Sequence, residues 1–79
     1  MRGHLLLFED IMIGRIKHIV SDRGFFFIVP NDGGGDVFGH ANQCDGAFQQ
    51  LRVGDYVEYD EDFDHTRNKM RGMNIRVVG

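Results

Sequence analysis

The 79-residue sequence predicts an all-β fold, in which five short antiparallel strands close into a small barrel. Eleven glycines and one proline suit many tight turns. Apolar and polar residues alternate with the two-residue period of strands, whereas helical periodicity is poor. Five short strands with no covering helix would leave two edges open to aggregation, and closure of the sheet removes both edges.

The first half of the chain is expected to form a three-stranded meander. Its strands are predicted at residues 13–20, 25–29 and 37–41, joined by turns at 21–24 and 31–36. Pro30 ends the second strand because it has no N–H to donate to a ladder. The second turn contains three consecutive glycines, which adopt positive φ without steric cost.

The second half is expected to supply two further strands. Residues 42–51 lack alternation and are predicted to be a loop, with a short helical turn near residues 47–50. The fourth strand is predicted at residues 56–60 and the fifth at 73–78, joined by a charged hairpin connection over residues 61–72. Six of the twelve acidic residues lie between Asp55 and Asp64, so this connection is expected to repel phosphates from one end of the barrel.

The composition excludes several classes of protein. Apolar residues make up 42% and charged residues 27%, as in globular chains, which argues against disorder or a coiled coil. The longest apolar stretches, Leu5–Phe8 and Phe25–Val29, are too short to span a bilayer, and the N-terminus lacks the apolar region of a signal peptide. A single cysteine, Cys44, excludes an intramolecular disulfide. A cytoplasmic location is therefore expected, with no membrane partner.

The second strand carries the most informative pattern. Alternation places Phe25 and Phe27 on one face and Phe26 and Ile28 on the other. Across the glycine-rich turn, Phe38 and His40 share a face while Val37 points the opposite way. If Phe26, Ile28 and Val37 enter the core, four rings lie together on the outside: Phe25, Phe27, Phe38 and His40.

An exposed group of three phenylalanines and an imidazole is unfavourable unless something stacks on it. Unpaired bases are suitable partners, because each base stacked on an aromatic ring contributes about 1–3 kcal/mol whatever its identity. Lys17 and Arg23 are expected at the rim, where they would meet phosphates, and His18 would stack or donate a hydrogen bond. The alternative is that the phenylalanines form a second core or a dimer contact. The net charge of −3 is unusual for a nucleic-acid binder, although the chain outside the acidic segment is mildly basic.

Several motifs in order resemble the bacterial cold-shock protein family over about residues 12–78. They are Gly14-Arg15-Ile16-Lys17-His18-Ile19, Arg23-Gly24-Phe25-Phe26-Phe27-Ile28, Asp36-Val37-Phe38-Gly39-His40, Leu51 to Tyr59 and Asn74 to Val78. The resemblance implies a five-stranded OB-fold barrel that binds single-stranded RNA or DNA and has an RNA-chaperone or regulatory role. It also implies that Lys17, Phe25, Phe27, Phe38 and His40 match ligand-contacting positions, with Arg23 in place of a lysine.

The sequence departs from the family pattern at positions that matter for stacking. His18 stands where the family has tryptophan, Ile19 where it has phenylalanine, and Ala41 where it often has phenylalanine. Losing these stacks at about 1 kcal/mol each would lower affinity by about two orders of magnitude. Two other changes offset each other: Phe26 replaces a glycine and Gly39 a valine, so the Phe26 ring is expected to cover Gly39.

Catalysis, metal binding and cofactors are not expected. His40 and Cys44 are the sole conceivable catalytic pair, and a small convex barrel offers no pocket or oxyanion hole. A second metal-binding pair to complement them is missing, and the acidic segment lacks the glycine and terminal glutamate of a calcium loop.

Residues 1–11 are predicted to be an apolar N-terminal extension to a domain that comprises residues 12–79. The extension could pack on the barrel, add a strand to an edge, or form a homodimer through residues 4–8 or an edge strand; a frayed terminus is the alternative. A rival to nucleic-acid binding thus remains at this stage: a protein–protein interaction module that has largely lost its nucleic-acid role.

Overall fold

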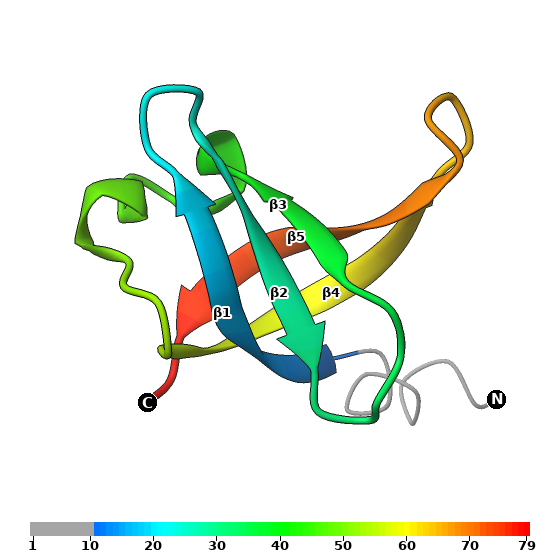
Figure 1. The fold of residues 1–79 in the computed structure, drawn as a ribbon, viewed down its shortest axis with the longest axis horizontal. Coiled ribbons are helices and arrows are strands. Elements are labelled where there is room, and N and C mark those ends of the chain that lie inside the picture. The colour runs from blue at the N-terminus through cyan, green and yellow to red at the C-terminus, as the bar shows by residue number, and fades with distance from the viewer. Residues whose placement is uncertain (1–10) are drawn as a thin grey trace, which may run out of the picture.

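A computed structural model describes residues 11–79, which fold into a five-stranded barrel with two short 3-10 helices (Figure 1). The elements in chain order are β1 (Ile11–Val20), β2 (Phe25–Pro30), β3 (Val37–His40), η2 (Ala41–Gln43), η3 (Phe48–Gln50), β4 (Tyr56–Asp64) and β5 (Lys69–Val77). In this part of the chain, no helix is long and apolar enough to cross a membrane.

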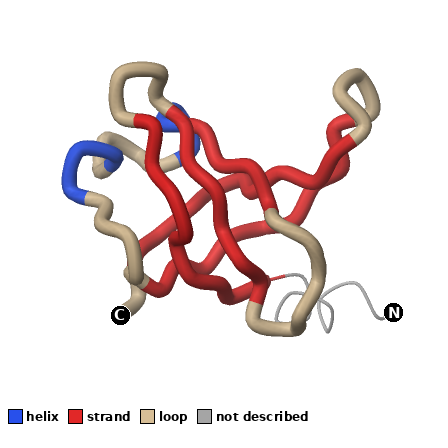
Figure 2. Tube along the Cα trace, in the orientation of Figure 1, coloured by secondary structure: helices blue, strands red, loops and turns tan. Residues whose placement is uncertain are grey.

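The strands close in the order β1-β2-β3-β5-β4, which confirms the predicted barrel (Figure 2). β1, β2 and β3 form the expected antiparallel meander, and β4 pairs with both β1 and β5 in antiparallel register. The seam between β3 and β5 differs from the prediction because these strands run parallel. Their register matches Phe38 with Arg71 and Gly39 with Gly72.

The core contains the side chains that alternation assigned to it. Phe26, Ile28 and Val37 are buried, and the barrel centre also holds Ile16, Val57 and Tyr59. Phe48 in η3 stacks on Phe26 with 6.0 Å between ring centroids, so the irregular segment after β3 covers one end of the core. Burial of these side chains contributes about 1.5–3 kcal/mol for each large apolar residue.

The predicted relation between Phe26 and Gly39 is present. The two residues face each other across β2 and β3, and a Cβ at Gly39 would lie 2.6 Å from Cε2 and Cζ of Phe26. Real Cβ contacts are never that close, so the Phe26 ring occupies the space that a larger residue would need at position 39.

Several predicted boundaries were wrong. β1 begins at Ile11, two residues before the predicted start of the first strand. β3 ends at His40, and Ala41 begins η2. The predicted connection over residues 61–72 is mostly strand: β4 and β5 continue to a tight turn at residues 65–68 and form a hairpin that projects beyond the barrel (Figure 1). The predicted packing or dimerisation of the N-terminal extension through residues 4–8 concerns a segment outside the described residues.

Candidate nucleic-acid interface

Four rings gather on the outer surface of β2 and β3, and we call Phe25, Phe27, Phe38 and His40 the aromatic platform. Register places Phe25 opposite His40 and Phe27 opposite Phe38. The Phe38 centroid lies 5.4 Å from that of Phe25, 6.0 Å from Phe27 and 6.5 Å from His40. The phenylalanines are half-buried and His40 is exposed, so the rings support one another while presenting surface to solvent.

A β-bulge in β1 brings two polar residues to the same outer face. Ile16 pairs with Ile28 and His18 pairs with Phe27, which leaves Lys17 as the extra residue between them. Lys17 and His18 are consequently both exposed, whereas regular alternation would turn one of them inward. The bulge thus places His18 beside Phe27. The Lys17 Nζ donates to Asp36 Oδ2 at 2.7 Å, so this cation is partly neutralised in the free protein.

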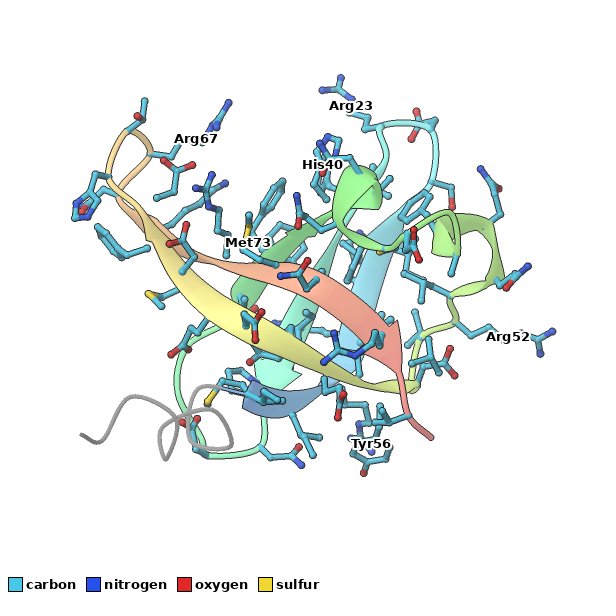
Figure 3. All side chains as sticks on the ribbon, turned by 180° about the vertical axis from the view of Figure 1, so that it is seen from behind. Arg23, His40, Arg52, Tyr56, Arg67 and Met73 are labelled. Atoms are coloured by element: carbon cyan, nitrogen blue, oxygen red, sulfur yellow. The ribbon has the colours of Figure 1, made fainter. Side chains whose placement is uncertain are left out.

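His40 is held in place by a local hydrogen bond. Its Nδ1 accepts from the Asn42 backbone N–H at 3.2 Å and thereby caps η2. Because Nδ1 is an acceptor there, the neutral imidazole carries its proton on Nε2, which remains available to a ligand. Arg23 lies in the exposed β1–β2 turn, and Figure 3 shows it close to His40 at the same end of the barrel. All seven sequence-predicted site residues therefore lie on this connected face or at its rim.

Two cations at this face were not among the predicted site residues. The Lys69 Nζ lies 4.1 Å from the centroid of the Phe38 ring, a cation–π contact, and Arg71 is in register with Phe38 across the parallel seam. Lys69 and Arg71 both lie in the segment that the sequence predicted to be a charged connection. Their position depends on the long-range pairing of β3 with β5, for which local pattern gives no signal.

Three of the six acidic residues between Asp55 and Asp64 are paired with basic residues. Asp62 accepts from Arg71 Nε at 2.7 Å, and Glu58 accepts from Arg76 Nη2 at 2.8 Å. Asp64 is buried and accepts from the backbone N–H groups of Arg67 and Thr66 and from the Arg67 guanidinium. The expected repulsion of phosphates is therefore weaker than the sequence suggests, because each of these three carboxylates has a cationic partner.

The pair of His40 and Cys44 has no geometry for catalysis. The buried Cys44 Sγ donates to the His40 backbone oxygen at 3.8 Å, not to the imidazole, and burial raises the pKa of the thiol to about 11. A thiol in this state is a poor nucleophile. Within residues 11–79, no three His, Cys, Asp or Glu side chains come together in an arrangement that could hold a metal ion.

Comparison with known proteins identifies the family. The "'Cold-shock' DNA-binding domain" family matches residues 12–78. "Cold shock protein CspA" of Rhizobium meliloti is 39% identical over 66 residues, which are 82% of this chain and 96% of that protein. "Probable cold shock protein y4cH" of Sinorhizobium fredii is 33% identical over 65 residues, or 81% of this chain and 94% of that protein.

A solved structure shows the same fold at low sequence identity. "Drosophila Unr CSD456" superposes with a TM-score of 0.74 at 15% identity, covering 99% of this chain and 31% of that one. The barrel topology, the motifs in their expected order and the family match over nearly all of the described chain agree. The chain belongs to the cold-shock domain family, as a divergent member.

Proposed function

We propose that this protein binds single-stranded RNA or DNA by stacking bases on the aromatic platform. The observation that carries the proposal is the cluster of Phe25, Phe27, Phe38 and His40, whose centroids are 5.4–6.5 Å from the Phe38 ring on a solvent-facing surface. Membership of a family described as a DNA-binding domain supports it, and that family is not one of enzymes. The family match favours this function over the protein-interaction alternative.

Cations border the aromatic platform where a nucleic-acid backbone would pass. We assign Lys17, His18 and Arg23 to phosphate or base contacts on the β1 side, and Lys69 to a phosphate contact on the β5 side. The Lys69 ammonium lies over the Phe38 ring in the free protein, so a base that stacks on this face displaces the ammonium, which can then contact a phosphate. Phosphate contacts release counterions, so affinity should fall as salt is added.

The binding should be weak and tolerant of sequence. His18 supplies less stacking surface than the tryptophan of the family, and Ile19 and Ala41 are partly buried and pack against the core. The aromatic platform is therefore limited to three phenylalanines and His40. Stacking does not discriminate strongly between bases, because every base has a π-face. Weak binding of this kind suits an RNA chaperone that keeps RNA unpaired. A cytoplasmic location is part of the same proposal and is supported by the similarity to cold shock proteins.

Fluorescence anisotropy with a labelled pyrimidine-rich decanucleotide tests the proposal. Wild type should bind saturably, and raising the salt concentration should weaken binding. Phe25→Ala and Phe38→Ala should each lower affinity about tenfold, because each removes one stacking surface. Circular dichroism must show that both variants remain folded.

Phe63→Ala is the matched control, because Phe63 is an exposed phenylalanine that lies outside the aromatic platform. On the β4–β5 hairpin, Phe63 packs on His65 and is in register with Met70. This variant should bind as wild type does. Equal loss of affinity in the control and the platform variants would show that general destabilisation, not stacking, causes the effect. Absence of binding at low salt would refute the proposal and leave protein association as the role of the platform.

A further inference from the structure

A further exposed aromatic side chain, that of Tyr56, lies on the same sheet surface, beyond the aromatic platform. Arg15 on β1 is in register with Val29 on β2 and with Tyr56 on β4. These three side chains point outward, and Val29 and Tyr56 are each 40% exposed. The Arg15 Cζ lies 5.7 Å from the centroid of the Tyr56 ring, so the guanidinium and the ring form a cation–π pair. We call Val29, Arg15 and Tyr56 the lower row.

The lower row continues the aromatic platform along β2. Phe25, Phe27 and Val29 are alternate residues of one strand and face the same way, so Val29 lies about 7 Å beyond Phe27. From Val29, the row crosses β1 to Tyr56 over about 10 Å, at the usual spacing between strands. Figure 3 shows Tyr56 at the opposite end of the barrel from Arg23 and His40. A single-stranded nucleic acid that runs from the aromatic platform along β2 would reach the lower row.

The chemistry of the lower row matches a nucleotide. A tyrosine ring offers a surface for stacking, and a guanidinium is suited both to stacking on a base and to bidentate contact with phosphate. Lys17 and Arg15 also line one surface depression with Val29, Val53 and Gly54, so two cations border the path. A nearby carboxylate, Glu58, is already paired with Arg76.

From this arrangement we infer a second nucleotide-binding subsite at Arg15 and Tyr56, which takes a base and phosphate of the strand that occupies the aromatic platform. The inference rests on the proposed function and extends its site from β2 and β3 across β1 to β4. The occupant is nucleic acid because the row is continuous with the platform and carries the unpaired cation Arg15, for which residues 11–79 supply no carboxylate partner.

The test compares strands of two lengths. A pyrimidine tetranucleotide should fill the platform alone, whereas a decanucleotide should also reach Tyr56. Tyr56→Ser should lower affinity for the decanucleotide about tenfold and leave tetranucleotide affinity unchanged, because one stack is lost. Tyr56→Phe, which retains the ring, should bind both strands as wild type does. Arg15→Gln should lower decanucleotide affinity and reduce its salt dependence by about one phosphate contact.

Arg52→Gln is the control for charge, because Arg52 is exposed in the loop before β4 and projects away from the barrel (Figure 3). Arg52→Gln should leave the affinities for the tetranucleotide and the decanucleotide almost unchanged. If Tyr56→Ser changes neither strand while Phe38→Ala weakens both, the second subsite is refuted and the proposed function stands. If neither strand binds wild type, the proposed function itself fails. Loss of a dimer in sedimentation of Tyr56→Ser, with unchanged binding, would identify the row as a protein contact and overturn the inference.

Discussion

Substitutions at Phe26 and Gly39, which face each other across β2 and β3, should show a large coupling free energy between the two positions. Phe26 is fully buried, and its ring carbons lie 2.6 Å from where a Cβ at Gly39 would be. Phe26→Gly removes the ring and adds a flexible residue to a strand, at a cost of about 4–6 kcal/mol. Gly39→Val in the wild type forces the ring and the new side chain apart, at a cost of about 1–3 kcal/mol.

The double variant should be more stable than Phe26→Gly alone. Without the ring, a valine at position 39 meets no clash and fills part of the cavity, so Gly39→Val should change from destabilising to stabilising. The coupling free energy should be about 2–3 kcal/mol. Urea denaturation followed by circular dichroism measures all four proteins of this cycle.

A domain of 79 residues has a free energy of unfolding of about 4–12 kcal/mol, so Phe26→Gly can unfold the protein. Phe26→Leu then replaces Phe26→Gly in the cycle. Gly39→Val should again change from destabilising to stabilising, with a smaller coupling free energy. Folded variants should retain nucleic-acid affinity, because Phe26 points away from the aromatic platform. The reasoning fails if Gly39→Val destabilises both backgrounds equally, or if binding and stability fall together in folded protein.

Three further predictions concern buried polar groups. Tyr59→Phe should raise stability by about 1 kcal/mol, because the buried hydroxyl has no hydrogen-bond partner among residues 11–79; a lower Tm would contradict this. The backbone N–H of Arg67 is the main cause of a lowered pKa at Asp64, aided by the Arg67 guanidinium, Thr66 and Arg71 and opposed by burial. Asp64 therefore stabilises the fold above its ordinary pKa of about 4, and this stabilisation is lost as pH falls through the lowered pKa. The Tm difference between wild type and Asp64→Asn should shrink in acid, and a difference that stays constant with pH would refute the assignment. Cys44, whose pKa burial raises to about 11, should react with a disulfide reagent at the rate of unfolding, and fast reaction of folded protein would show the thiol to be accessible.

The parts of the fold that depend on local pattern could be predicted from the sequence. Alternation correctly assigned Phe26 and Ile28 to the core and Phe25 and Phe27 to the outer face, because the period of a strand allows no other arrangement once one residue is buried. Alternation, together with the departures from the cold-shock family pattern at these two positions, anticipated the contact between Phe26 and Gly39. The family and the barrel are likewise confirmed.

The parts that leave little local sequence pattern could not be predicted. Residues 61–72 contain many charges, and their side chains on one face form ion pairs across the hairpin, so a strand there has little apolar alternation to signal it. The positions of Lys69 and Arg71 beside Phe38 follow from the parallel seam between β3 and β5. The bulge at Lys17 was equally hidden, because a single extra residue leaves no mark in composition.

If nucleic acid stacks on the aromatic platform as proposed, the parallel seam should link binding to the closed form of the barrel. β3 meets β5 over a register of two residue pairs, and one of them contains Phe38 of the aromatic platform. Short pairing makes this junction a place where the barrel can open locally, and opening would carry Phe38 away from Lys69. We expect a single-stranded nucleic acid that stacks on Phe38 to bind the closed form alone and so to shift the population toward it. Amide hydrogens along β3 and β5 should then exchange more slowly in the complex, which makes the seam a reporter of occupancy as well as a structural junction.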